Sequence, residues 1–320
     1  MKILIVSSID PSAVAKLREQ HDVVCDFHAK TETLPALIKD REVLIFRSGI
    51  NITADVMACA PHLKLLVRAG SGFDNVDLDY IQAQGIEMFR IPEPGAKAVA
   101  EMSFALMLAL SRNIVEADRL TKQGRWAKNE LTGYALAGKT LGIVGAGNIG
   151  THVGHLGVAW GMHVMGCVAN PSPKVAAALA DKGVRLTDFN ELVAKSDYLS
   201  LHVPLSDSTR NLINEDVLRR MKPGSFLINL ARGGVVDEAA LHKALTEGWL
   251  RGAGMDVHKA EGEGKISPLA GLPNVILTPH IGAGTFDAQR EIGGRIVEIV
   301  GAFVAQQTAA QPRPEAVVMA

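Results

Sequence analysis

The chain has 320 residues, 48% of them hydrophobic, and its 33 Lys and Arg residues nearly balance 34 Asp and Glu. That length allows two domains with their own cores, and no basic tract or lysine-rich amphipathic stretch points to nucleic acid or a membrane. The N-terminal apolar run, Ile3–Val6, is too short for a signal peptide. Three widely spaced cysteines, Cys25, Cys59 and Cys167, are typical of a reducing compartment and indicate neither disulfides nor a metal site. We therefore expect a cytoplasmic location.

The first third of the chain alternates short apolar runs with helical patterns. Strands are predicted at 2–6, 23–27, 43–46, 63–68 and 86–91, and helices at segments such as 12–20 and 53–60. Fully apolar strands that alternate with helices predict a parallel sheet covered on both faces.

A long helical pattern follows over Val99–Gln123, with an interruption near Ser111–Arg112. The alternation then restarts with strands expected at the start of 140–150 and at 163–168, 198–203, 225–230, 253–257 and 274–280. A final helix over Phe286–Gln306 has nothing of its own to pack on, so we expect it on the first domain. The prediction is an α/β chain with two Rossmann-like, doubly wound parallel-sheet domains and a cleft between them.

The segment Gly145-Ala146-Gly147-Asn148-Ile149-Gly150 comes directly after a predicted strand and opens a helix. In such a turn the first glycine permits the tight bend, the second lets a pyrophosphate approach the backbone, and the third lets helix and strand pack closely. Phosphates then lie at the helix N-terminus, where N–H groups and the dipole favour negative charge. The segment predicts dinucleotide binding.

The next strand ends in Val168, Ala169 and Asn170. NAD-binding units usually carry an acid here that holds the ribose hydroxyls. Because that acid is missing, we expect NADP to be favoured slightly, or accepted as well as NAD. The alternative is that Asn170 reaches the ribose and the cofactor remains NAD.

Three chemically active residues follow three further strands: Arg232, Glu261 and His280. Each alone has an ordinary explanation, as a surface arginine, a solvated loop acid and a core histidine. Together they lie at the strand ends where ligands bind in a doubly wound sheet.

With these motifs, the chain resembles the D-isomer-specific 2-hydroxyacid dehydrogenase family. The matching stretches cover nearly the whole chain: RAGSGFDNVDLD, VAE at 99–101, RW at 125–126, LAGKTLGIVGAGNIG, LHVPLSDSTRNLIN, MKPGSFLINLARGGVVDEAAL, MDV and NVILTPHIGAGT.

The resemblance implies a substrate domain at 1–98 plus 285–320 and a dinucleotide-binding domain at 99–284. It also implies that Arg232, Glu261 and His280 form the catalytic triad. The implied substrate contacts are Arg47, Ser48, Gly70, Ser71 and Gly72. The implied cofactor contacts are Gly145, Gly147, Asn148, Ile149, Gly150, Val168, Ala169, Asn170, His202, Val203, Pro204, Thr209, Ala231, Asp256 and Gly282.

Four positions depart from the family pattern. His258 stands where an aromatic residue usually follows DV, and Gly262 stands where a proline usually follows the glutamate. The loop of Glu261 is therefore expected to be looser, and Glu263 is an alternative acid. Ala98 replaces a frequent serine, and Val168 stands at the place of the ribose acid.

These residues support hydride exchange between a nicotinamide cofactor and a small D-2-hydroxy acid or 2-keto acid, with glyoxylate, hydroxypyruvate or a phosphoglycerate-like compound as substrate. Arg232 would hold the carboxylate and carbonyl, His280 would transfer the proton, and Glu261 would stabilise the imidazolium. The resemblance also implies a homodimer. Two alternatives remain: an NAD(H)-binding corepressor on the same fold, and oxidation of formate or phosphite.

Overall fold

The computed structural model describes residues 1–70 and 72–310. The chain divides into two compact units, one made of Met1–Pro94 with the segment that starts at Thr285, the other of Gly95–Gly284. Each unit contains a parallel sheet with helices between its strands. The predicted α/β class with two parallel sheets is therefore confirmed.

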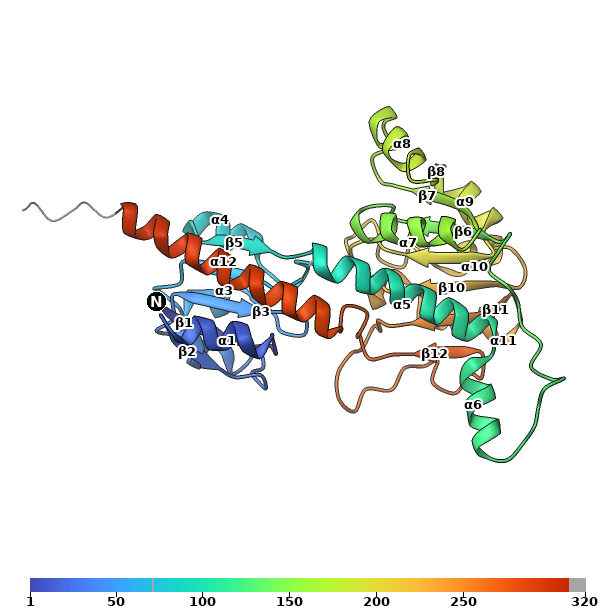
Figure 1. Cartoon of the computed structure of the whole chain (residues 1–320), viewed down its shortest axis with the longest axis horizontal. Helices are drawn as coiled ribbons and strands as arrows, with labels where there is room; N and C mark the ends of the chain where they lie inside the picture. Colours follow the sequence, from blue (N-terminus) through green and yellow to red (C-terminus); the bar gives the residue numbers. More distant parts are fainter. Residues whose placement is uncertain (71, 311–320) are drawn as a thin grey trace, which may run out of the picture. The chain divides into compact units, whose positions relative to one another are not determined.

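Within the described residues, the sheet of the first unit has five parallel strands in the order β2-β1-β3-β4-β5 (Figure 1). The strands are β1 Lys2–Ile5, β2 Asp22–Cys25, β3 Val43–Phe46, β4 Leu65–Arg68 and β5 Glu87–Arg90. The helices are α1 Pro11–Arg18, α2 Leu34–Ile38, α3 Ala54–Ala58, α4 Leu78–Gln84 and α12 Phe286–Ala310.

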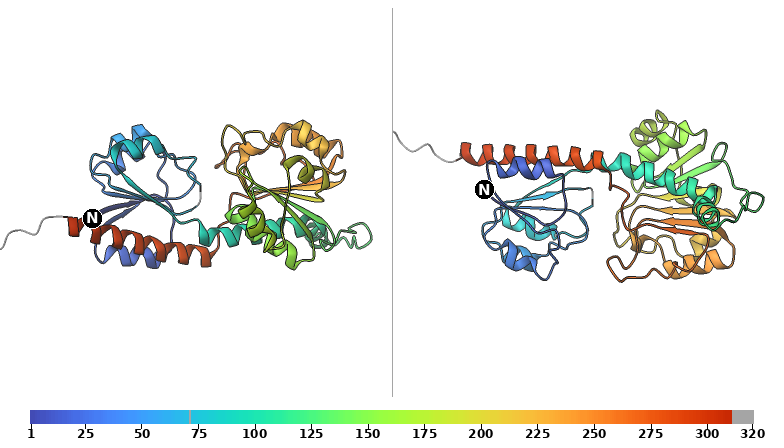
Figure 2. Two further views of the ribbon diagram at one scale, coloured as in Figure 1. Left: turned by 90° about the horizontal axis from the view of Figure 1, so that it is seen from above. Right: turned by 60° about the horizontal axis from the view of Figure 1, so that its bottom comes forward.

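Alternation along each strand gives this sheet two apolar faces. Ile3 and Ile5 of β1 pack with α1 and α12, while Leu4 packs with α2, α3 and α4 on the other face. Helix α12 lies alongside α1, as the two views of Figure 2 agree. The C-terminal helix thus completes the core of a unit that begins at the N-terminus.

In the described part of the second unit, the sheet has seven parallel strands in the order β12-β11-β10-β9-β6-β7-β8. The strands are β6 Thr140–Val144, β7 His163–Cys167, β8 Arg185–Leu186, β9 Tyr198–Leu201, β10 Ser225–Asn229, β11 Leu250–Met255 and β12 Val275–Leu277. The helices are α5 Glu93–Ser111, α6 Ile114–Lys122, α7 Asn148–Ala159, α8 Pro173–Ala180, α9 Phe189–Lys195, α10 Glu215–Arg220 and α11 Glu238–Thr246, with a 3₁₀ turn at Gly233–Val235.

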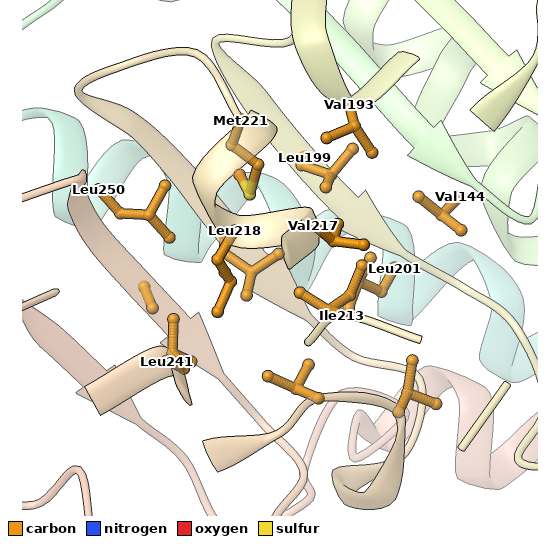
Figure 3. Packing of buried hydrophobic residues seen from close by; sticks show 14 of the residues in the cluster. Val144, Val193, Leu199, Leu201, Ile213, Val217, Leu218, Met221, Leu241 and Leu250 are labelled. Atoms are coloured by element: carbon orange, nitrogen blue, oxygen red, sulfur yellow. The ribbon is translucent and has the colours of Figure 1, made fainter. Parts of the chain in front are cut away.

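Both faces of the second sheet are covered. Helices α9, α10 and α11 bury one face through an aliphatic cluster, seen in Figure 3, in which Leu218 and Leu241 pack with strand residues such as Leu199. Helices α5, α7 and α8 cover the other face, with Phe104 and Val153 among the buried side chains. Strands buried on both sides explain the continuous apolar runs in the sequence.

Helix α5 begins at Glu93, earlier than the predicted start at Val99. Pro94 and Gly95 lie in its first turn, where a missing backbone N–H costs nothing because those donors have no partner within the helix. The helix ends at Ser111, and Asn113 has left-handed backbone (φ 52°) before α6 begins. None of the described helices is by itself long and apolar enough to span a membrane; only α5 and α6 taken together are, and they are bent by 59°.

The order of the strands reverses beside β6. From β6 the chain moves to β7 and β8 on one side, then crosses to β9, β10, β11 and β12 on the other. Ligands bind at such a reversal, outside the carboxyl ends of the strands.

The glycines after β6 serve different purposes. Gly145 has left-handed backbone (φ 93°), and a Cβ there would lie 2.8 Å from the His202 carbonyl oxygen. A Cβ on Gly150 would lie 2.3 Å from the Gly145 carbonyl oxygen. A Cβ on Gly147 would meet nothing within 4 Å. The outer two glycines are therefore required by packing, whereas the space above Gly147 is open.

This difference predicts losses of stability of different size. Gly150→Ala should lower the free energy of unfolding by about 1–3 kcal/mol, because its new methyl group collides with backbone that cannot turn away. Gly147→Ala should cost less than about 1 kcal/mol. Denaturant unfolding followed by circular dichroism measures both. Equal losses in the two variants would contradict the assignment.

Candidate active site

The predicted residues of the second unit all follow strands of its sheet at the carboxyl ends. Gly145–Gly150 follows β6, Val168 follows β7 and His202 follows β9. On the other side of the reversal, Arg232 follows β10, Glu261 follows β11 and His280 follows β12, which are neighbours in the sheet. The carboxyl ends of parallel strands meet at one edge, so one sheet edge presents all of these groups.

His280 and Glu261 form a direct pair. The distance from His280 Nδ1 to Glu261 Oε2 is 2.8 Å. A carboxylate can only accept, so Nδ1 donates, and this leaves Nε2 as the nitrogen able to exchange a proton with a ligand. The acid that the structure pairs with His280 is Glu261, not Glu263.

The second oxygen of Glu261 accepts the backbone N–H of His258 at 3.0 Å. Burial alone would raise the pKa of the Glu261 carboxyl, but the hydrogen bonds from His280 and from this N–H, with the charges of the two histidines, hold that pKa below its ordinary value. Glu261 is therefore ionised at neutral pH and carries the negative charge beside the imidazole.

Asp256 holds the backbone that presents His280. His280 has left-handed backbone (φ 55°), which is uncommon for a residue with a side chain. Its N–H donates to the Asp256 carbonyl at 2.8 Å, while the Asp256 carboxylate accepts the N–H groups of Ile281 and Gly282 at 2.9 and 2.8 Å and the Thr278 hydroxyl at 2.6 Å. Asp256 is only 2% exposed, so its carboxylate serves the turn around His280.

Arg232 is half-buried. Hydrogen bonds within its own loop fix the backbone from which its side chain extends. Asn229, fully buried at the end of β10, accepts the Ala231 N–H at 3.0 Å and donates to the Arg232 carbonyl at 3.1 Å. One guanidinium nitrogen of Arg232 donates to the Ala231 carbonyl at 2.7 Å. The buried amide therefore sets the direction in which the arginine leaves the sheet.

The turn after β6 fits a dinucleotide. Helix α7 starts at Asn148, has no side-chain cap and carries no acid in its first turn, so its first N–H groups remain available to an anion. Ile149 lies in this turn, half-buried, and the space above Gly147 admits a phosphate where a side chain would fill it.

The end of β7 carries no acid. Val168 is half-buried, while Ala169 and Asn170 are exposed. Ser172 then caps α8 by accepting the Val175 N–H at 3.3 Å, and the first turn of α8 has no acidic residue. No carboxylate on these residues would repel a 2′-phosphate.

The segment after β9 lies beside the glycine turn. Burial lowers the pKa of His202 to about 3, so this imidazole is neutral at physiological pH, and its Nε2 lies 2.8 Å from the Ser200 hydroxyl. Val203 Cγ1 would lie 2.9 Å from a Cβ on Gly145. The Thr209 hydroxyl donates to the Pro204 carbonyl at 2.6 Å, which closes the loop.

The candidate substrate residues lie in the first unit. Arg47 and Ser48 follow β3, and Gly70 and Gly72 follow the adjacent strand β4; Ser71 lies outside the described residues. The Arg47 backbone N–H donates to Ser7 Oγ at 3.0 Å, and burial lowers the pKa of its guanidinium.

Sequence reasoning missed the residues that hold these groups. Asp256 appeared as a cofactor contact, while Asn229 and Thr278 did not appear at all. The available signal was a polar residue at the end of an otherwise apolar strand, as in SFLIN. Its partner cannot be read from the sequence.

Comparisons with known proteins agree with this geometry. The family model described as "D-isomer specific 2-hydroxyacid dehydrogenase, NAD binding domain" matches residues 104–282. The chain is 38% identical over 293 residues to the hydroxypyruvate reductase of Thermotoga maritima, which covers 91% of this chain and 94% of that protein. It is 40% identical over 299 residues to the D-3-phosphoglycerate dehydrogenase of Methanocaldococcus jannaschii, covering 93% of this chain but 56% of that longer protein.

Among solved structures, the D-lactate dehydrogenase from Aquifex aeolicus complexed with NAD and lactic acid superposes with a TM-score of 0.85. It is 31% identical in sequence and covers 96% of this chain and 97% of that one. The resemblance that the motifs suggested is thereby confirmed. The chain belongs to the D-isomer specific 2-hydroxyacid dehydrogenase family, whose enzymes transfer hydride between a nicotinamide cofactor and 2-hydroxy or 2-keto acids.

Proposed function

We propose that this enzyme reduces a small 2-keto acid, with glyoxylate or hydroxypyruvate as the leading substrate, and that Arg232, Glu261 and His280 carry the reaction. The observation that carries the proposal is the 2.8 Å hydrogen bond between His280 Nδ1 and Glu261 Oε2. These two residues follow β12 and β11, and Arg232 follows the next strand of the sheet, β10. A spectrophotometric panel of 2-keto acids with NADH and NADPH tests it. Oxidation of formate or phosphite without reduction of any keto acid would overturn it.

In this mechanism the bound nicotinamide supplies the hydride for C2 of the substrate. The planar fork of Arg232 bridges the substrate carboxylate and the carbonyl oxygen. Protonated His280 donates from Nε2 to that oxygen, and in the reverse direction it takes the proton back. Glu261 fixes the imidazole through Nδ1 and stabilises its charged form.

We also propose that residues of the first unit help to bind the substrate carboxylate. The backbone N–H groups of Gly70, Ser71 and Gly72 would bind it, with Arg47 and Ser48 beside the same strand ends. Burial of the Arg47 guanidinium, which lowers its pKa, supports a role with an anionic ligand, because a buried cation is stabilised by an opposite charge. In this assignment Met1–Pro94 and the C-terminal helix form the substrate domain, and Gly95–Gly284 forms the dinucleotide domain.

For the cofactor, we propose that NADP(H) is preferred or accepted comparably with NAD(H). The pyrophosphate would bind over Gly147 at the N-terminus of α7, with Gly145, Asn148, Ile149 and Gly150 shaping that turn. The adenosine end would lie near Val168, Ala169 and Asn170 on one side and His202, Val203, Pro204 and Thr209 on the other. The nicotinamide end would lie near Ala231, Asp256 and Gly282.

We also propose a homodimer formed through α5 and the segment after it. Ile114, Val115, Trp126 and Tyr134 expose large apolar side chains there, Trp126 to 82%, and exposed apolar clusters of this kind mark protein interfaces. Sedimentation should give twice the 34.1 kDa chain mass, and the Val115→Asp, Trp126→Asp variant should sediment as a monomer. A monomeric wild type would contradict the proposal.

Arg232→Ala should lower kcat/KM for the keto acid by several orders of magnitude and leave cofactor affinity within a few-fold. The variant loses charge-assisted hydrogen bonds that strengthen in the transition state, and a single such donor is worth about 10²–10³-fold. Steady-state kinetics and cofactor titration measure the two effects. Arg220→Ala, an exposed arginine on α10, is the matched control and should change neither. Cofactor affinity that falls in step with turnover would assign Arg232 to the nucleotide site instead.

His280→Gln should nearly abolish turnover at every pH, whereas Glu261→Gln should leave measurable activity with an altered pH profile. Reduction requires protonated His280, and without the carboxylate that form is less stable. The limb of the profile on which reduction declines with rising pH should therefore move to lower pH. An unchanged profile in Glu261→Gln would remove this residue from the mechanism.

Val168→Asp should shift the ratio of kcat/KM values towards NAD by about tenfold or more. An aspartate there accepts hydrogen bonds from the ribose hydroxyls, and bonds to a charged group contribute about 1.5–3 kcal/mol, or roughly 10- to 150-fold. Kinetics with both reduced cofactors measure the ratio. A wild-type preference for NADH above about a hundredfold would show that the acid is not needed for NAD selectivity.

A further inference from the structure

We propose that His258 is a positioning residue that holds Glu261 in place against His280 by tying the loop after β11 to the end of β12. The inference rests on the proposed function, because it concerns the pair assigned to proton transfer. His258 does not touch the reacting atoms; it acts through Glu261.

The first contact is made by the His258 backbone. Its N–H donates to Glu261 Oε1 at 3.0 Å, while Glu261 Oε2 accepts His280 Nδ1 at 2.8 Å. The carboxylate is thus held on one side by its own loop and on the other by the catalytic imidazole. The His258 N–H is therefore one of the two contacts that set the direction of the carboxylate.

The second contact is made by the His258 side chain. Nε2 lies 3.0 Å from the Thr278 carbonyl oxygen, which can only accept, so Nε2 carries the proton. Nδ1 is buried and makes no hydrogen bond with the described residues. The ring is therefore anchored through Nε2 to a residue two positions before His280, and it links the loops that carry the two members of the pair.

The loop of Arg232 packs against the same peptide. A Cβ on Gly233 would lie 2.0 Å from the carbonyl carbon and oxygen of His258 and 2.4 Å from the Lys259 nitrogen. On the side of α11, the Lys259 N–H donates to Glu238 Oε1 at 2.7 Å, and Glu238 is only 7% exposed. The His258–Lys259 peptide is therefore a fixed point shared by the loops of Arg232, Glu261 and His280.

Beyond Glu261 the loop offers little restraint. Residues 261–266 are exposed, and Gly262 and Gly264 both have positive φ angles, 117° and 75°. Glycine backbone is flexible, and these side chains are little covered by the described residues. Within this loop, the restraint on Glu261 therefore comes from His258, whose N–H holds the carboxylate and whose ring ties the loop to Thr278.

Three substitutions of His258 distinguish the effect of its hydrogen bond to the Thr278 carbonyl from the effect of the size of its ring. His258→Gln keeps an N–H donor near the position of Nε2, His258→Asn is too short to reach the Thr278 carbonyl, and His258→Phe keeps the ring but has no donor. We expect Asn and Phe to lower kcat by about three- to tenfold with little change in KM, the loss that corresponds to one ordinary hydrogen bond. Their pH profile for reduction should move in the same direction as that of Glu261→Gln, and His258→Gln should remain close to wild type.

The double variants decide whether His258 acts through Glu261. In a Glu261→Gln background, His258→Asn should cause no further movement of the pH profile, since the carboxylate it positions is gone. His242→Asn, an exposed histidine on α11, is the matched control and should change nothing. An equal movement with and without Glu261, or a Gln variant as impaired as the Asn variant, would overturn the proposal.

A measurement without turnover separates this inference from the proposed function. In ¹⁵N-histidine-labelled protein, with His280 assigned through His280→Gln, the neutral ring of His280 should carry its proton on Nδ1 in wild type and in His258→Gln. That tautomer should be depleted in His258→Asn. If no 2-keto acid is reduced but the tautomers follow this pattern, the proposed function fails and the positioning role stands. If turnover is found and His258→Asn leaves the tautomer unchanged, the positioning role fails alone.

Discussion

The left-handed backbone of His280 is the constraint on which the geometry of the active site depends. This conformation costs about 1–2 kcal/mol for a residue with a side chain, and it persists because Asp256 holds the turn from two directions. The carbonyl of Asp256 accepts the His280 N–H, and its carboxylate accepts the next two N–H groups along the chain. Hydrogen bonds to a charged acceptor contribute about 1.5–3 kcal/mol each, which is enough to offset the strain.

The same turn explains why Gly282 is a glycine. A Cβ there would lie 2.9 Å from Asp256 Oδ2 and 3.2 Å from Leu230 Cδ2. A side chain would therefore displace the carboxylate that fixes His280. The position serves the turn first, and the cofactor contact proposed for Gly282 would follow from where the turn lies.

Much of the fold could be predicted from the sequence because its signals are local. The apolar strand VLIF coincides with β3, and the last helix begins at Phe286 as predicted, although it continues to Ala310. The prediction was wrong about the start of α5, because Pro94 and Gly95 look like helix breakers unless they fall in the first turn. Strand β8, only Arg185–Leu186, carries too few residues to show a period.

The three candidate catalytic residues could also be proposed from the sequence, since an arginine, an acid and a histidine follow three apolar strands. Their supporting contacts were not. The bond from His258 to the Thr278 carbonyl joins residues 20 apart, and the bonds to Asp256 join residues up to 26 apart. The residue types at those positions do not predict which residues pair. The pairing depends on how strands β11 and β12 bring their ends together.

The candidate catalytic residues and the residues proposed to select the cofactor also differ in how strongly the fold constrains them. Arg232 and His280 leave the sheet from positions fixed by the buried partners Asn229 and Asp256, so their directions change only when the core changes. Ala169 and Asn170, in contrast, are exposed at the end of β7 and support nothing beneath them. Substitutions at that tip would alter the proposed contacts with the ribose at little cost to the fold. Under the proposed function, preference between NAD and NADP could therefore vary while the His280–Glu261 pair stays unchanged.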